Sequence, residues 1–130
     1  MRGTVQTVAQ LTSTAPIDLP FPYSGGSHGV IALRKIGSFR QITFQVTNGR
    51  FNVTTDTLTL RTKADSGLVQ TWRASPSKNN DLTIAIIRQT SPFVRSLSMA
   101  REFIVEAEFF GAGRRQFVFA PQGLDLLFLS

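Results

Sequence analysis

Residues 91–124 read SPFVRSLSMAREFIVEAEFFGAGRRQFVFAPQGL, and this stretch decides the fold class. Ser91 and Pro92 are typical of the start of a helix. The apolar residues that follow recur at helical spacing, with Phe93, Leu97 and Ala100 on one face. We therefore predict a helix over Phe93–Ala100. Because so short a helix is unstable alone, it must pack against a sheet.

The second half of the stretch predicts a β-hairpin. Its strands are expected at Glu102–Phe110 and Arg114–Ala120, where polar and apolar residues alternate, with Gly111-Ala112-Gly113 as the turn. One face of the first strand carries Phe103, Val105, Ala107 and Phe109, and one face of the second carries Arg115, Phe117 and Phe119. Glu106 and Glu108 lie on the opposite face, where Arg114 could pair with them.

The preceding residues alternate in the same way and predict further strands. These strands are Val30–Lys35, Phe39–Thr47, Arg50–Thr54, Thr57–Lys63, Leu68–Ala74 and Leu82–Arg88. Asn48-Gly49 predicts a tight hairpin between the second and third of them, because both residues tolerate positive φ. In Leu82–Arg88 both faces are largely apolar, which is typical of a central strand. The expected fold is mainly β, an antiparallel sandwich or sheet of about eight strands with one short helix packed on it.

Length and composition limit the architecture and the chemistry. The 130 residues suit one β-rich domain over 21–130, preceded by an N-terminal arm or edge strand over 1–20. The chain has no cysteine, which excludes disulfides and thiolate chemistry. No apolar run has the length of a membrane span, and the N-terminus lacks the apolar segment of a signal peptide.

The charge balance favours an acidic partner. Fourteen Lys and Arg against eight Asp and Glu give a formal net charge of +6, which suits an acidic protein, nucleic acid or a membrane surface. Scattered bases also keep a β-protein soluble and its edges unpaired, and that is the simpler explanation. The candidate partner-binding residues are Arg61, Lys63, Trp72, Arg73, Arg114 and Arg115. For Trp72, core packing is the first interpretation and an anchor in a binding groove the second.

Catalytic chemistry has little support in the sequence. His28 is the single histidine and follows Ser27 directly, a spacing that rarely gives the geometry of a nucleophile and its base. We interpret it as a turn residue. Glu106 and Glu108 have the spacing of a glycosidase carboxylate pair, but the nearby Arg114 favours a salt-bridged surface. We predict no catalytic residue, no metal site and no cofactor.

Three segments resemble a family of bacterial envelope proteins. The segment SPFVRSLSMAREFIVE at 91–106 is similar to its "fi-x-x-l-x-x-A-x-x-l-x-v" segment, and QFVFAPQGL at 116–124 to its closing strand. Phe21-Pro22-Tyr23-Ser24-Gly25 matches the "fPY-x-G" opening of a looser, uncharacterised group. The family is the type VI secretion accessory protein VasI, also called TagO. The resemblance implies an envelope-associated, non-enzymatic accessory or binding domain, located in the periplasm or cell envelope; without it the cytoplasm is expected.

The sequence therefore predicts a protein-binding or assembly module that recognises an acidic protein surface through an exposed strand edge or the groove beside the helix. Two alternatives remain open. One is a structural subunit of a virion or appendage, which would form a homo-oligomer through an arm at residues 1–20. The other is a basic nucleic-acid-binding domain, for which Tyr23 and Trp72 would be the stacking platforms.

Overall fold

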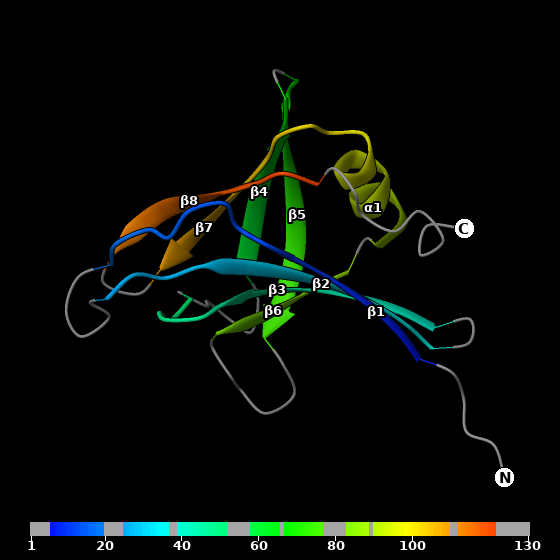
Figure 1. Ribbon diagram of the computed structural model, residues 1–130, viewed down its shortest axis with the longest axis horizontal. Helices are drawn as coiled ribbons and strands as arrows, with labels where there is room; N and C mark the ends of the chain where they lie inside the picture. Colours follow the sequence, from blue (N-terminus) through cyan, green and yellow to red (C-terminus); the bar gives the residue numbers. More distant parts are fainter. Residues whose placement is uncertain are drawn as a thin grey trace, which may run out of the picture.

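The chain forms one antiparallel sheet, bent so far that it nearly closes on itself, with a short helix beside it (Figure 1). The computed structural model describes residues 6–19, 25–36, 39–51, 58–65, 67–76, 83–88, 90–109 and 112–121. The strands are β1 (Gln6–Thr12), β2 (Gly29–Ile36), β3 (Phe39–Val46), β4 (Leu58–Ala64), β5 (Val69–Pro76), β6 (Ile84–Ile87), β7 (Phe103–Phe109) and β8 (Gly113–Phe119), and the helix is α1 (Thr90–Ser98). The mainly-β fold with one helix is confirmed.

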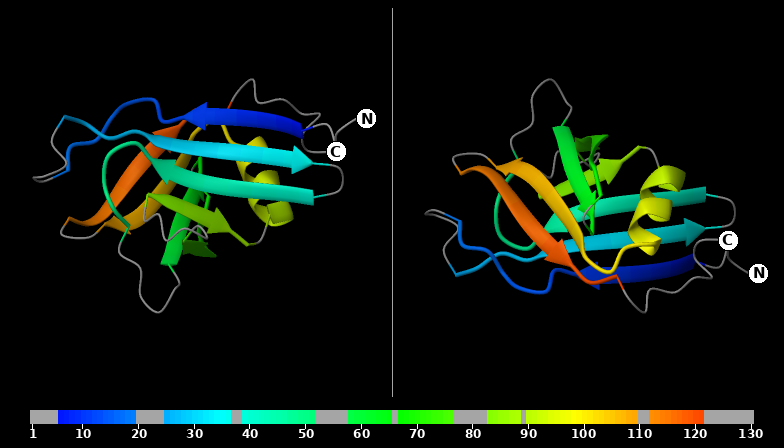
Figure 2. Two further views of the ribbon diagram at one scale, coloured as in Figure 1. Left: turned by 90° about the horizontal axis from the view of Figure 1, so that it is seen from below. Right: turned by 90° about the horizontal axis from the view of Figure 1, so that it is seen from above.

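The strand order explains the shape. Neighbouring strands follow the order β1-β2-β3-β6-β5-β4-β7-β8, and each neighbouring pair is antiparallel. In Figures 1 and 2, β1–β3 cross β4 and β5 at a steep angle, so the sheet folds over its own core. The two ends of the order meet, because the Thr14 amide donates to the Val118 carbonyl at 2.8 Å. The Thr14 hydroxyl donates to the same carbonyl at 3.3 Å, so this residue links the segment after β1 to β8.

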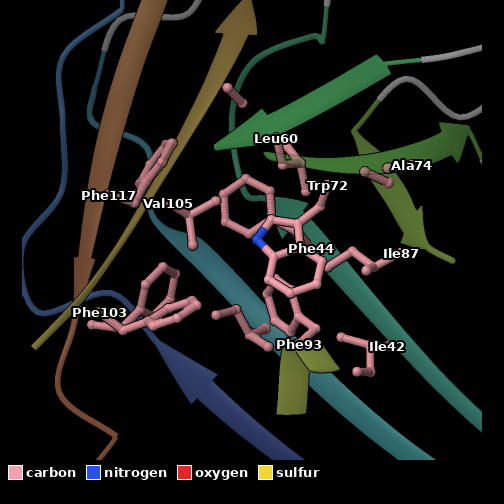
Figure 3. Packing of buried hydrophobic residues seen from close by; sticks show 14 of the residues in the cluster. Ile42, Phe44, Leu60, Trp72, Ala74, Ile87, Phe93, Phe103, Val105 and Phe117 are labelled. Atoms are coloured by element: carbon pink, nitrogen blue, oxygen red, sulfur yellow. The ribbon is translucent and has the colours of Figure 1, made fainter. Parts of the chain in front are cut away.

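Phenylalanine rings fill the space that the sheet encloses. Those that are essentially inaccessible to solvent are Phe44, Phe51, Phe93, Phe103, Phe109, Phe117 and Phe119. They contact one another in edge-to-face, tilted or stacked pairs, with centroids 5.2–6.2 Å apart. Figure 3 shows Phe44 and Ile42 from β3 together with Leu60 from β4 in one cluster. The inward positions of the alternating segments therefore form the core, as their pattern predicts.

The helix follows its predicted apolar face but differs at its ends. Phe93, Leu97 and Ala100 are buried, as expected from their spacing. However, α1 begins at Thr90, so Ser91 lies inside the helix instead of capping it, and Ala100 lies beyond its last residue. Pro92 is still in the first turn, where a missing backbone N–H leaves no hydrogen bond unmade.

The predicted hairpin at Asn48-Gly49 is wrong. The neighbours of β3 are β2 and β6, and β6 pairs along Ile42–Gln45. The chain leaves β3 after Val46, and Phe51 forms an isolated bridge with Phe109 instead of returning along β3. Residues 52–54 of the predicted return strand lie outside the described residues, as do Tyr23, predicted as a stacking platform, and residues 122–124 of the closing segment.

Candidate interaction surface

Four of the predicted basic residues share the outward face of one half of the sheet. In β4, Leu58, Leu60 and Thr62 are buried, so the alternate residues Arg61 and Lys63 point outward. The register places Lys63 opposite Val69 and Thr59 opposite Arg73, which puts Arg73 of β5 on the same face. We call the outward residues of β4, β5, β7 and β8 the outer face.

Strand β7 adds carboxylates between these bases. Glu106 and Glu108 lie on the outer face, and the Arg61 Nη1 is 3.4 Å from the Glu106 Oε2. Gln116 of β8 donates to the other oxygen of Glu106, and Glu108 is opposite Arg114 in the register. The expected salt-bridged surface is present, but the partner of Glu106 is Arg61 of β4 and not Arg114. Because both side chains remain in contact with solvent, the pair stabilises the fold by at most about 1 kcal/mol.

Arg114 and Arg115 do not act as a pair. Arg114 is exposed on the outer face, whereas Arg115 follows the inward alternation and is half-buried. The Nε of Arg115 donates to the Ala112 carbonyl at 3.2 Å, which holds this guanidinium over its own turn. The described outer face therefore carries four of the predicted bases, Arg61, Lys63, Arg73 and Arg114, against two carboxylates, Glu106 and Glu108.

Trp72 belongs to the core, in agreement with its first interpretation. Its side chain is 4% exposed, and its ring meets Phe93 edge to face at 5.1 Å. The indole Nε1 donates to the Thr62 Oγ1 at 2.7 Å, which satisfies both buried polar groups. Trp72 thus holds α1 against β5 and does not reach the surface.

The loop around His28 is a structural connection. Its backbone amide donates to the Thr47 hydroxyl, and its carbonyl accepts from the Thr47 amide. Ser27 is fully buried, and its hydroxyl accepts from the Asn48 amide. A hydroxyl so placed cannot attack a substrate from solvent. Across the described part of the chain, no three His, Cys, Asp or Glu side chains gather as metal ligands would.

The turn between β4 and β5 is where sequence reasoning missed a surface feature. The pattern predicts Leu68 on the same face as Trp72, and hence inward, but Leu68 is 90% exposed. Val69 is 59% exposed, and Met99, just after α1, is 78% exposed. The hairpin projects beyond the rest of the sheet (Figure 1), so its first β5 residues have little to pack against. Two adjacent aliphatic residues after the turn sequence Asp65-Ser66-Gly67 were the available signal.

Asp65 fixes this turn to the start of β7. Its Oδ1 accepts from the amides of Arg101 and Glu102 at 3.1 and 3.0 Å, and its own amide donates to the Glu102 carbonyl. Leu68 and Val69 are therefore presented from a turn that is tied to the body of the protein.

Comparisons with known proteins add no assignment. No protein-family model, curated protein or solved structure matches the chain. Among the described residues, no helix is long and apolar enough to cross a membrane.

Proposed function

We propose that this chain is a non-enzymatic protein-binding or assembly module whose partner carries an acidic surface. The supporting observation is a contrast between its exposed and buried side chains. The outer face exposes bases, and the β4–β5 turn exposes the aliphatic residues Leu68 and Val69. In contrast, every aromatic ring whose burial the structure describes is buried.

This contrast favours a protein over a single-stranded nucleic acid. Proteins that bind single strands stack bases on exposed aromatic rings between their basic residues. The described surface offers bases and aliphatic side chains, which suit a protein partner with carboxylates and apolar residues. The bases attract such a partner at long range, and the apolar residues contribute once contact is made. The resemblance to the VasI/TagO family leads us to look for this partner in a bacterial envelope.

The experiment compares two anionic probes on the intact protein, a polyglutamate peptide and a single-stranded oligonucleotide of the same charge. Both are labelled, and binding is followed by fluorescence anisotropy at about 50 mM and 500 mM salt, where screening lengths differ about threefold. We expect saturable binding of polyglutamate at low salt, tighter than that of the oligonucleotide. The double variant Lys63→Glu/Arg114→Glu should weaken it about tenfold.

Arg115→Glu is the matched control, because Arg115 is held over its turn and lies off the outer face. It should weaken polyglutamate binding less than either outer-face substitution. Tighter binding of the oligonucleotide would overturn the proposal in favour of nucleic-acid binding. Absence of polyglutamate binding at low salt would also overturn it.

A further inference from the structure

Strand β5 has a free edge within the described residues. It pairs with β4 along Val69–Ala74, but with β6 only along Ala74–Pro76. Beyond that overlap, the Arg88 amide donates to the Arg73 carbonyl at 3.3 Å. No described strand lies alongside Val69–Thr71 on the side away from β4.

The backbone groups of this edge point outward from the sheet. The Arg73 carbonyl faces β6, so the N–H and C=O groups of Arg73 lie on the side away from β4. Because these directions alternate along an antiparallel strand, the N–H and C=O groups of Val69 and Thr71 face the same way. The side chains of Val69, Gln70 and Thr71 are all exposed. Such an edge can accept a further strand.

Charge identifies the kind of strand that the edge would accept. Three segments that border it are Val69–Pro76, residues 83–88 and Thr90–Ser98, and they contain Arg73, Arg88 and Arg95 but no carboxylate. The carboxylate of Asp65, in the preceding turn, accepts hydrogen bonds from the amides of Arg101 and Glu102. All three arginines are exposed. A second copy of this chain would bring like charges together at the same edge, which disfavours self-pairing. An acidic segment would be attracted.

The two sides of the edge differ, and this difference predicts which residue types should alternate along an added strand. On the outer face the edge presents Val69, Thr71 and Arg73, next to Lys63 in the register. The opposite side faces α1, since the Ser96 hydroxyl donates to the Gln70 Oε1 at 3.0 Å, and Figure 1 shows α1 on the β5 side of the hairpin. By alternation Leu68 belongs to this second side. An added strand therefore meets bases on one side and an exposed aliphatic residue on the other.

We propose that the Val69–Thr71 edge of β5 is the docking site for an extended, acidic segment of a partner protein, in which acidic and aliphatic residues alternate. The inference rests on the proposed function and locates its binding site. The segment would pair with the backbone of Val69 and Thr71, place its carboxylates toward Arg73 and Lys63, and place its aliphatic residues toward Leu68.

The test uses a seven-residue peptide of alternating Glu and Val, added to the intact, isotopically labelled protein and followed by amide NMR and hydrogen exchange. We expect saturable shifts and slower exchange at the amides of Val69 and Thr71. A Lys/Val peptide of the same length should leave them unchanged. Lys63→Glu/Arg73→Glu should weaken binding about tenfold, which corresponds to about 1.4 kcal/mol.

Proline variants test the strand pairing itself. Thr71→Pro removes an N–H that faces away from β4, so it should abolish protection of Val69 while the fold is retained. If that variant fails to fold, Val69→Pro, at the end of the strand, replaces it. Arg115→Glu, on β8 and off the outer face, is the matched charge control and should leave the edge site intact.

The outcomes separate this inference from the proposed function. Shifts that fall on the outer face around Arg61 and Arg114, with none at Val69 and Thr71, would overturn the edge site and leave an acidic-protein binder. Equal binding by Thr71→Pro and Val69→Pro would also overturn the edge site. If neither the peptide nor polyglutamate binds at low salt, both the site and the proposed function fail.

Discussion

Trp72 connects two parts of the molecule through one buried hydrogen bond. Its indole donates to Thr62 on the neighbouring strand, and its ring packs on Phe93 of α1. Removing one partner leaves the other polar group buried and unsatisfied, whereas removing both leaves an apolar contact. The contributions of the Trp72 indole and the Thr62 hydroxyl to stability therefore depend on each other.

We expect Trp72→Phe and Thr62→Val each to lower the free energy of unfolding by about 1–3 kcal/mol. The double variant should lose less than the sum of the two, because no unpaired polar group remains. Urea denaturation of the four proteins measures the coupling. Additive losses would show that the 2.7 Å contact between the Nε1 and the Oγ1 contributes no net stability.

Gly29 is required by close packing. A Cβ at this position would lie 2.9 Å from the Phe44 Cε1 and 3.0 Å from atoms of Phe117 and Phe119. We expect Gly29→Ala to lower the free energy of unfolding by about 1–3 kcal/mol, because these rings are packed on all sides and cannot move freely. Phe44→Leu should partly rescue it, so that the double variant is more stable than additivity predicts. A neutral Gly29→Ala variant would contradict this packing.

At the scale of elements, Asp65 determines how the β4–β5 hairpin is held. It has a positive φ of 53° and accepts two backbone hydrogen bonds from the start of β7. Asn tolerates positive φ and keeps a carbonyl oxygen, Gly tolerates the φ but loses the acceptor, and Ala loses both advantages. These three substitutions therefore separate backbone strain from hydrogen bonding.

We expect the Asn variant to have the highest unfolding temperature of the three, the Gly variant a lower one and the Ala variant the lowest. The Ala variant should lose about 1–3 kcal/mol of the free energy of unfolding. Thermal unfolding measures the order. The Ala variant should also accelerate amide exchange at Arg101 and Glu102, whose N–H groups lose their acceptor. If Gly were as stable as the unsubstituted protein, the hydrogen bonds would be unimportant and only the backbone conformation would matter.

The sequence predicted elements well where alternation and packing agree. The hairpin of β7 and β8 was placed to within one residue at each end, because the inward aromatic residues and the glycine turn give the same answer. At Asn48-Gly49 the local turn signal was overridden, since β6, nearly forty residues later, occupies the position that the return strand would take. Pairing between strands so far apart in the sequence has no signal in the residues around the turn.

The candidate surface was predictable in part for the same reason. Alternation alone placed Arg61, Lys63 and Arg73 on outward positions, and the structure brings them to one face. The free edge of β5 could not be predicted, because it depends on how far the four-residue β6 extends along a longer neighbour. The exposure of Leu68 depends on the same difference in length between β5 and β6.

At the scale of the whole molecule, closure of the sheet depends on the N-terminal segment. Strand β1 covers one side of β2, and Thr14 then bonds to β8 through both its amide and its hydroxyl, each to the Val118 carbonyl. In this arrangement β1 forms its backbone hydrogen bonds with β2 of the same chain. An arm that exchanges between subunits would instead leave β2 to be covered by a neighbour.

These two arrangements predict opposite responses when residues 1–18 are deleted. If β1 serves its own chain, the intact protein is a monomer by light scattering, and the deletion uncovers the edge of β2, so the mass rises with concentration. If β1 is exchanged, the intact protein is an oligomer that dissociates on deletion, which would favour the virion or appendage subunit. Thr14→Pro removes both the amide and the hydroxyl donor to Val118, so that variant should remain monomeric and lose about 1 kcal/mol of stability. Thr14→Ser keeps both donors and should be as stable as the unsubstituted protein. We expect the first response, because β1 of the same chain already pairs with β2 along Val30–Ile36.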